Sequence, residues 1–306
     1  MKIACVGGFG VGETMRVDVA PGAGETVTGG VLSVGPGGKA SNQAVQARRL
    51  GEEALLISAV GRDGQAQVGR TLWAAEGVDD RGVVSLDEPT MVGFIIVDSE
   101  GQNRIALAPG ALGSATPHSC AGAIELVAEC DVVVVSFELN PAVGFAALRR
   151  AHDEGKVTVC NPAPALDIPA DVLACIDYLV PNESEARTIA EHKGWQVDSL
   201  ESIALAFRGL GTRNVIITLG GDGVLYSSAQ EMRTLAALPA SQVVDTTGAG
   251  DSFVGAFAVA IGKGKEPLDA IRFAMAAASL SVEKPEVVPS LPRLASVEAR
   301  LGEVLV

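Results

Sequence analysis

The sequence contains the glycine-rich turn Asp245-Thr246-Thr247-Gly248-Ala249-Gly250-Asp251, which leads directly into the uncharged, helix-like segment 252–262. Glycine at positions 248 and 250 lets the backbone turn its N–H groups toward one point, at the place where a helix begins. The dipole of that helix adds positive potential at the same point. The stretch therefore predicts an anion hole with a carboxylate, Asp251, held in the same turn.

A carboxylate in that position can take a proton from a hydroxyl group that attacks a phosphoryl group bound at the glycines. The alternative is that Asp251 merely occupies the first turn of a helix and that the glycines merely make a tight turn. The position of the turn and its composition together favour the chemical role.

A second glycine-rich turn, Gly35-Pro36-Gly37-Gly38-Lys39-Ala40-Ser41-Asn42, also precedes a helix-like segment. Its glycines would let a ligand approach the backbone closely. Lys39 and Asn42 supply a charge and an amide that can both contact sugar hydroxyls. The alternative is an ordinary helix start with Ser41 as the N-cap. The turn lacks the G-x-x-x-x-G-K-[ST] pattern of a Walker A loop.

A third glycine-rich run, residues 7–12, follows the first expected strand, as a dinucleotide-binding fingerprint would. Counted from Gly8 and Gly10, however, the third glycine of G-x-G-x-x-G would fall on Glu13. This mismatch argues against a dinucleotide-dependent oxidoreductase.

Short β-branched runs alternate with helix-like segments along most of the chain. The runs expected as strands are 2–6, 55–60, 132–137, 157–160, 178–180 and 215–219. The segments expected as helices are 41–50, 64–75, 141–154, 183–192, 199–210, 251–262 and 267–282. Nearly continuous apolarity indicates strands that are covered on both faces, and the alternation predicts an α/β fold with a parallel sheet.

Two segments break this alternation. Residues 11–34 are glycine-rich and β-like, and residues 91–97 and 103–108 flank a turn as the strands of a hairpin do. We expect insertions at about 11–36 and 90–109 to form a small β lid on a single domain that spans 1–306. Arg104, in the second hairpin strand, is a candidate substrate contact because its guanidinium is a forked donor. The alternative is a strand charge that protects a sheet edge.

The composition is that of a chain with a large aliphatic core. Hydrophobic residues make up 48% of the 306 residues, which excludes an intrinsically disordered chain. Acidic residues outnumber basic residues by 37 to 23, for a formal net charge of −14. Such a surface repels phosphate backbones and anionic lipid, so we expect neither nucleic acid nor a membrane as a partner.

Five cysteines stand far apart, at positions 5, 120, 130, 160 and 175, without a C-x-x-C pair. Their odd number and apolar neighbours indicate reduced, buried thiols in a cytoplasmic protein. The longest uncharged apolar stretches are shorter than the roughly 18 residues that span a bilayer. Because so few residues precede Cys5, we do not expect a signal sequence that is cleaved there.

Five motifs occur in a fixed order along the chain. The outer two are GGKASNQAV at 37–45 and DTTGAGDSFVGA at 245–256. Between them lie NPAPA at 161–165, PNESEA at 181–186 and ITLGGDG at 217–223. In these motifs the chain resembles the ribokinase-like (PfkB) family of sugar and nucleoside kinases. The resemblance implies a three-layer α/β sandwich with a mostly parallel central sheet and a small β lid. It also implies transfer of the γ-phosphoryl group of ATP, with Mg²⁺, to a primary hydroxyl of a small sugar or sugar-like substrate.

The resemblance further implies roles for individual residues. Asp251 would be the catalytic base, and the anion hole would be formed by Gly248, Ala249 and Gly250. The sugar would be held by Gly38, Lys39, Asn42 and Glu138. The nucleotide would contact Asn182, Thr218, Gly220, Gly221 and Gly223. Glu185 would act indirectly on magnesium, and Asp245 and Thr247 would contribute to a site for a monovalent cation such as K⁺.

Two of these roles have simpler alternatives. Glu138 directly follows an expected strand, where a solvated loop acid is common. The Asn-x-x-Glu pattern at 182–185 is also a common helix start. Only the order of the flanking motifs favours the functional roles.

The chain departs from the family pattern in three places. Members that bind ribose carry Asn-x-Asp after the first strand, where this chain has Gly10-Val11-Gly12 and Glu13 is the nearest acid. We therefore expect ribose to be a poor substrate. Ala40 replaces a common glycine. Lys284-Pro285-Glu286 replaces a glycine-containing loop beside the cation site, so we expect weak activation by potassium.

Three questions stay open at this stage. A nucleoside or pseudouridine kinase of the same fold is one alternative function. A non-catalytic sugar-binding relative is another, although the intact Asp251 and its glycine turn argue against it. The sequence also leaves open a homodimer in which the β lids of two chains clasp.

Overall fold

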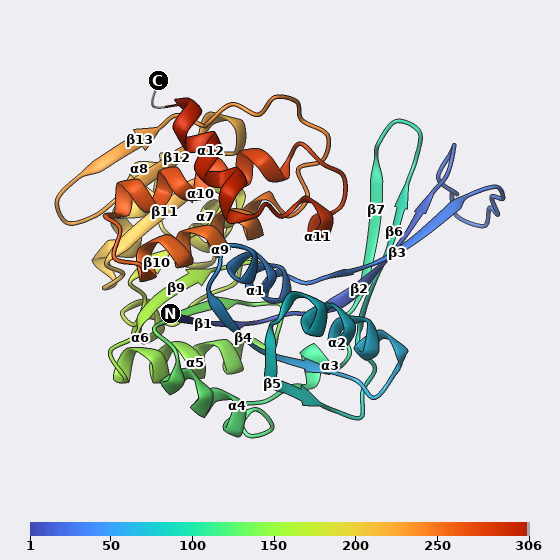
Figure 1. Ribbon diagram of the computed structural model, residues 1–306, viewed down its shortest axis with the longest axis horizontal. Helices are drawn as coiled ribbons and strands as arrows, with labels where there is room; N and C mark the ends of the chain where they lie inside the picture. Colours follow the sequence, from blue (N-terminus) through green and yellow to red (C-terminus); the bar gives the residue numbers. More distant parts are fainter. Residues whose placement is uncertain (305–306) are drawn as a thin grey trace.

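The computed structural model describes residues 1–304, in which a large sheet lies between two layers of helices and a smaller sheet projects to one side (Figure 1). In this part of the chain the large sheet has nine strands, in the order β13-β12-β11-β10-β9-β8-β1-β4-β5. Their bounds are β1 Lys2–Val6, β4 Glu53–Val60, β5 Asp79–Ser85, β8 Val132–Ser136, β9 Val157–Asn161, β10 Tyr178–Leu179, β11 Asn214–Thr218, β12 Val224–Ser227 and β13 Met232–Leu235. In this order, all neighbouring strands from β11 to β5 pair in parallel, whereas β12 pairs antiparallel with both β11 and β13.

Helices cover both faces of this sheet because its central strands are apolar on both sides. In β8, Val132 and Val134 belong to one hydrophobic cluster, while Val133 and Val135 belong to the other. The first cluster includes α1 Lys39–Arg49, α2 Gly64–Glu76, α9 Ala249–Gly262, α10 Pro267–Ser281, α11 Val287–Ser290 and α12 Leu294–Val304. The second includes α3 Ala111–Ser114, α4 Ala121–Glu125, α5 Pro141–Asp153, α6 Ala170–Leu173, α7 Glu183–His192 and α8 Leu200–Gly209. The predicted three-layer sandwich is confirmed.

The smaller sheet is the predicted lid. Within the described residues it has the order β3-β2-β6-β7, with bounds β2 Gly10–Arg16, β3 Val31–Gly37, β6 Met91–Val97 and β7 Asn103–Ala108. Strand β2 pairs in parallel with β6, so the two segments that interrupt the α/β alternation meet along one ladder. We refer to these four strands as the lid.

Two helices begin earlier than the sequence predicts. Helix α1 begins at Lys39 after Gly38, whose φ is 98°, and α9 begins at Ala249 after Gly248, whose φ is 80°. A positive φ ends the preceding segment sharply and lets the first helical turn follow at once. The alternative of Ser41 as an N-cap is wrong, because the Ser41 hydroxyl is buried and accepts a hydrogen bond from Trp73 Nε1 at 2.9 Å.

Two further predictions concern buried, reduced thiols and membrane-spanning segments. All five cysteines are free, with four buried and Cys175 half-buried. Among residues 1–304, no helix combines the length and the apolarity needed to cross a membrane.

Candidate active site

A cavity of about 180 Å³ lies at the carboxyl ends of the central parallel strands, where α/β folds place their ligands. The turns before α1, α7 and α9 meet there with the ends of β9 and β11. Its walls include Lys39, Asn161, Ala163, Val180, Asn182, Glu185, Thr218, Gly248, Gly250, Asp251 and Val254. The structure therefore brings together seven of the residues that the sequence singled out.

Asp251 lies in the first turn of α9, with only 7% of its surface exposed. Its Oδ2 atom accepts a hydrogen bond from Asn42 Nδ2 at 2.7 Å, and Oδ1 accepts a longer one from Gln43 Nε2 at 3.4 Å. Burial raises the pKa of Asp251 above its ordinary value, while the charge of Lys39 and the two amides oppose that rise. The carboxylate is therefore held in one orientation and is more basic than an exposed aspartate.

Lys39 is surrounded by carboxylates. Burial lowers the pKa of Lys39, but Asp251, Glu138 and Glu185 outweigh that effect and bring it above its ordinary value. Lys39 is therefore a permanent cation in the cavity wall, and it offsets part of the negative charge of these acids.

Glu138 follows β8 and is not a solvated loop acid. Its Oε2 atom accepts a hydrogen bond from the backbone N–H of Lys39 at 2.6 Å, and burial raises its pKa. The neighbouring Gly38 has no room for a side chain, since a Cβ there would lie 2.5 Å from the Cα of Phe9. These contacts attach the turn before α1 to the ends of β1 and β8.

Asn182 and Glu185 form the helix start that the sequence allowed, and they also line the cavity. Asn182 Oδ1 accepts a hydrogen bond from the Glu185 N–H, and Glu185 Oε2 accepts one from the Asn182 N–H, both at 2.8 Å. Burial raises the pKa of Glu185. Asn182 also bridges in parallel to Thr218, which brings the end of β11 to the same wall. One pair of side chains thus both caps α7 and presents a carboxylate to the cavity.

The remaining glycines of the nucleotide motif lie beside the cavity rather than in its wall. Gly220 and Gly221 belong to a short 3₁₀ turn, Gly220–Asp222, directly after Thr218 and Leu219. Gly223 closes this turn, since its carbonyl accepts a hydrogen bond from the Leu219 N–H at 2.8 Å. Of this motif, Thr218 is therefore the predicted residue that lines the cavity.

Asp245 connects the anion-hole turn to the loop before α11. Its Oδ1 atom accepts a hydrogen bond from the Thr247 N–H at 2.9 Å, and Oδ2 accepts one from the Glu286 N–H at 3.2 Å. Burial raises the pKa of Asp245, but these hydrogen bonds outweigh it and lower the pKa below its ordinary value. Glu286 adopts φ 64° and ψ 155°, and no other described non-glycine residue has a positive φ.

Sequence reasoning missed two polar residues of the site. The Gln43 Nε2 atom also lies 3.3 Å from Asn161 Oδ1, and Asn161 Nδ2 donates to the Val180 carbonyl at 3.1 Å. Gln43 and Asn161 therefore connect three motifs that are distant in the sequence. Both stand inside quoted motifs, GGKASNQAV and NPAPA, and that membership was the only available signal.

The same order of motifs defines a known protein family. The sequence pattern of the "pfkB family carbohydrate kinase" matches residues 8–294. The chain is a member of the pfkB carbohydrate kinase family. Ribokinase of Schizosaccharomyces pombe is 32% identical over 97% of this chain and 97% of its own length, and that of Staphylococcus aureus is 33% identical over 97% and 98%.

Solved structures agree with this assignment to the pfkB family. Ribokinase of Thermotoga maritima aligns with a TM-score of 0.91 at 32% identity, covering 98% of this chain and 99% of its own. Ribokinase of Arabidopsis thaliana, solved in complex with ribose and ATP, aligns with a TM-score of 0.90 at 30% identity, covering 98% of both chains. This pfkB family member is thus a carbohydrate kinase by sequence and by fold.

The lid of this pfkB family member differs at the positions expected to hold sugar hydroxyls. A side chain at Gly10 would collide with Met91, whereas a Cβ at Gly12 would have Ile95 Cδ1 as its nearest neighbour, at 3.6 Å. Arg104 is not brought to the cavity. Its Nη1 atom donates to the Pro21 carbonyl at 2.6 Å, and the register of β6 and β7 puts Arg104 opposite Ile96, on the other face of the lid from Met91. This geometry favours the alternative interpretation of Arg104, as a charged strand residue held within the lid.

Proposed function

We propose that this chain transfers the γ-phosphoryl group of ATP to a primary hydroxyl of a small sugar. The observation that carries the proposal is the buried carboxylate of Asp251 in the first turn of α9, directly after the Gly248–Gly250 turn. The first N–H groups of a helix have no acceptor within the helix, so they are free to face an anion.

Each residue then has a definite task in the transfer. The sugar oxygen attacks the γ-phosphorus while its proton passes to Asp251, a new O–P bond forms, and the bond to the β-phosphate oxygen breaks so that ADP leaves. Asn42 and Gln43 hold the carboxylate in place, and the first turn of α9 and the Lys39 ammonium stabilise the negative charge. Glu138 lies beside the Lys39 backbone, where it is placed to accept hydrogen bonds from sugar hydroxyls.

Magnesium fits this site as an ion carried by the nucleotide. No group of three or more His, Cys, Asp or Glu side chains among the described residues is arranged to hold a metal ion. Mg²⁺ commonly keeps several waters and binds through phosphates and one or two carboxylates. Glu185 is the carboxylate on the nucleotide side of the cavity, and it would hold the ion through water. The bound ion would neutralise phosphate charge.

The cation site predicted at Asp245 and Thr247 is part of the same proposal. We expect K⁺ to raise kcat less than in typical family members, because Pro285 restricts the backbone beside Glu286. The test is turnover during titration with potassium chloride against choline chloride at constant ionic strength. A large rise specific to potassium would contradict this expectation.

The substrate is proposed to be a sugar other than ribose. Met91 occupies the space beside Gly10, and no polar side chain stands at Gly12. Gly12→Asp should fit, and a charged hydrogen bond worth about 1.5–3 kcal/mol would raise kcat/KM for ribose roughly tenfold to a hundredfold. Gly10→Asn is the control, since Met91 blocks its side chain. If the unmodified chain prefers ribose to all other sugars and nucleosides in a panel, this part of the proposal is wrong.

We also propose that two chains pair through the lid. Large apolar side chains are exposed on its strands, at Val31, Leu32, Val34, Phe94, Ile105 and Leu107. The strand registers put Leu32, Val34 and Phe94 on one face of the lid and Val31, Ile105 and Leu107 on the other, and a second copy would bury the face that carries Phe94. Phe94→Lys should yield monomers in sedimentation analysis, whereas Leu205→Lys on α8, with 53% exposure against 52% for Phe94, should not. Monomers in the unmodified protein would contradict the pairing.

The five free thiols support a cytoplasmic location.

The central experiment replaces Asp251 with Asn. Loss of a general base costs about 10²–10⁴ in rate, so Asp251→Asn should lower kcat by that factor with little change in ATP affinity. Asp269→Asn, at the same place in the first turn of α10, is the matched control and should leave kcat unchanged. Asp251→Asn should also raise the melting temperature at neutral pH, because burial disfavours the charged carboxylate. Near-normal kcat in Asp251→Asn would contradict the proposed function.

A further inference from the structure

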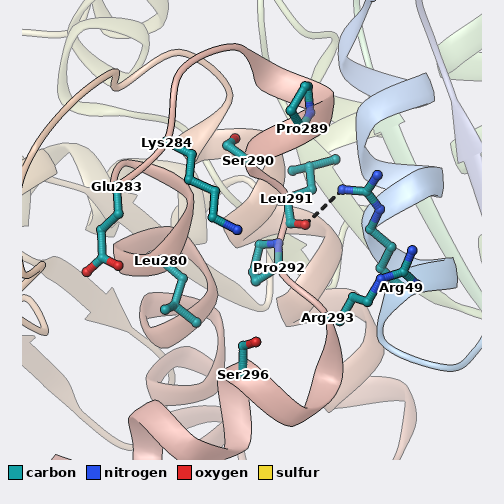
Figure 2. Close-up of a pocket in the computed structure, with 10 residues that line it drawn as sticks. All are labelled: Arg49, Leu280, Glu283, Lys284, Pro289, Ser290, Leu291, Pro292, Arg293 and Ser296. Atoms are coloured by element: carbon teal, nitrogen blue, oxygen red, sulfur yellow. Dashed lines mark hydrogen bonds between the residues drawn. The ribbon is translucent and has the colours of Figure 1, made fainter.

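A second cavity, of about 310 Å³, lies between the C-terminal ends of α1 and α10 and the N-terminal turn of α12 (Figure 2). Its apolar surface comes from Leu280, Pro289, Leu291 and Pro292. Its polar groups are Arg49, Glu283, Lys284, Ser290, Arg293 and Ser296. None of these residues lines the active-site cavity.

The three cationic side chains of this cavity differ in the hydrogen bonds and ion pairs that they form. Arg49 is structural, since it donates to the carbonyls of Val288 and Leu291 at 2.6 and 2.8 Å and pairs with Glu76. Lys284 and Arg293 are exposed, and neither side chain forms a hydrogen bond or ion pair within residues 1–304. Two cationic heads are thus available to a ligand.

The one acid in the wall does not neutralise them. Glu283 Oε1 accepts hydrogen bonds from the Ser241 N–H at 2.7 Å and from Arg300 Nη2 at 2.8 Å. Figure 2 shows the Glu283 carboxylate directed away from the Lys284 ammonium, which reaches toward Pro292 in the middle of the cavity. Glu76, just outside the wall, is a second nearby acid, and its pKa is lowered by hydrogen bonds from Arg49 and, to a smaller extent, by the charge of Arg293. Since Glu76 pairs with Arg49 and Glu283 pairs with Arg300, the charges of Lys284 and Arg293 leave the cavity with a positive local potential.

This concentration of cations is unusual for so acidic a chain, with 23 basic against 37 acidic residues. Three of the 23 converge on one cavity. The first turn of α12, which contributes Ser296, adds the positive end of an eleven-residue helix. The cationic side chains and the helix dipole both favour an anion, and Ser296 can donate a hydrogen bond to it, whereas the Ser290 hydroxyl donates to the Val287 carbonyl at 2.7 Å.

We propose that this cavity binds a small organic polyanion, with phosphate or carboxylate groups on Lys284, Arg293 and Ser296. The volume is at the lower end of the range for small-molecule sites and exceeds the space that one phosphate ion needs. The apolar wall of Leu280, Leu291 and Pro292 suits the carbon skeleton of such a ligand.

The same loop that forms this cavity also contacts the proposed phosphoryl-transfer site. Glu286 donates its N–H to Asp245, and the Val287 side chain lies where a Cβ on Gly248 would stand. A ligand on Lys284 would therefore restrain the residues that support the anion hole. This regulatory part rests on the proposed function, whereas the binding part does not.

The test of binding is calorimetric titration with citrate and, separately, with glycerol 3-phosphate, on protein saturated with ADP so that the active site is filled. The double variant Lys284→Gln/Arg293→Gln should bind the effective probe more than tenfold more weakly than the unmodified protein. The matched control Lys265→Gln/Arg272→Gln removes the same two charges from exposed positions around the other end of α10 and should bind normally.

Each outcome decides between the alternatives. Tight binding of citrate alone identifies carboxylate chemistry, and tight binding of glycerol 3-phosphate alone identifies phosphate chemistry. Equal affinity in the unmodified protein and the Lys284/Arg293 double variant, or no binding of either probe at about 10 mM, overturns the site. The regulatory part requires that the bound probe change kcat at constant free Mg²⁺ in the unmodified protein only, and an unchanged kcat refutes it.

Discussion

Glu286 occupies a backbone conformation that side chains disfavour, and replacing it with glycine should stabilise the protein. Its φ of 64° and ψ of 155° lie in a region that is essentially reserved for glycine. The surrounding contacts impose this conformation, since the Glu286 N–H donates to Asp245 and the next residue begins α11. Those contacts involve the backbone, so Glu286→Gly preserves them.

The magnitude follows from two opposing effects. Relief of the strained backbone contributes about 1–3 kcal/mol to the free energy of unfolding. The greater freedom of glycine in the unfolded chain offsets about 0.5–1 kcal/mol of that gain. A net gain of about 1 kcal/mol remains. With an unfolding entropy of about 2.1 cal/mol/K per residue, it raises the melting temperature of a chain of this length by about 1.5 °C.

Differential scanning calorimetry at pH 7 checks this expectation. The matched control is Glu266→Gly, the same substitution at an exposed N-cap whose φ is −59° and whose side chain makes no capping hydrogen bond. With no strain to relieve, Glu266→Gly should lower the melting temperature slightly. A lower melting temperature in Glu286→Gly, by as much as in the control, would show that the Glu286 backbone stores no strain.

Three further predictions concern the site and its surroundings. Because the Lys39 charge opposes the rise in the pKa of Asp251, Lys39→Met should move the acidic limb of the kcat/KM profile to higher pH. An unmoved limb would count against this electrostatic effect of Lys39 on Asp251. Gln43→Leu should lower kcat by about tenfold with the KM for ATP unchanged, since one long hydrogen bond to the base is lost. Burial raises the pKa of Asp63, but hydrogen bonds, chiefly from Thr90, outweigh it and lower the pKa in the folded state. The free energy of unfolding should thus fall as the pH drops through that pKa, and Asp63→Asn should flatten this loss in denaturant titrations.

The central strands and the two functional turns could be predicted because their signals are local. A continuous apolar run such as 132–137 has few other interpretations when helix-like segments flank it. The edge strands β5 and β13, and β12 next to β13, are not predicted from the sequence. Strand β5 begins with Asp79-Asp80-Arg81, and most of β13 is exposed, so neither has the apolar pattern of a buried strand.

The contacts within the site depend on packing and could not be predicted from the sequence. Asn42 and Asp251 are 209 positions apart, and their hydrogen bond exists because α1 packs against α9. The sequence suggests Asn42 as a sugar contact, and in the structure its Nδ2 atom donates to Asp251 while its buried Oδ1 atom has no hydrogen-bond partner among the described residues. For Arg104, only the strand register shows which face of the lid it occupies.

The burial of four of the five cysteines means that unfolding can be followed by the number of thiols that react with a labelling reagent. Cys175, near the short helix α6, is the half-buried thiol, while the other four lie in the protein interior. A brief pulse of a thiol reagent should therefore add one label to the native protein and five to the open chain. The mass difference between these two products measures the open fraction without any engineered probe, and Cys175 offers a single attachment point outside the walls of both cavities.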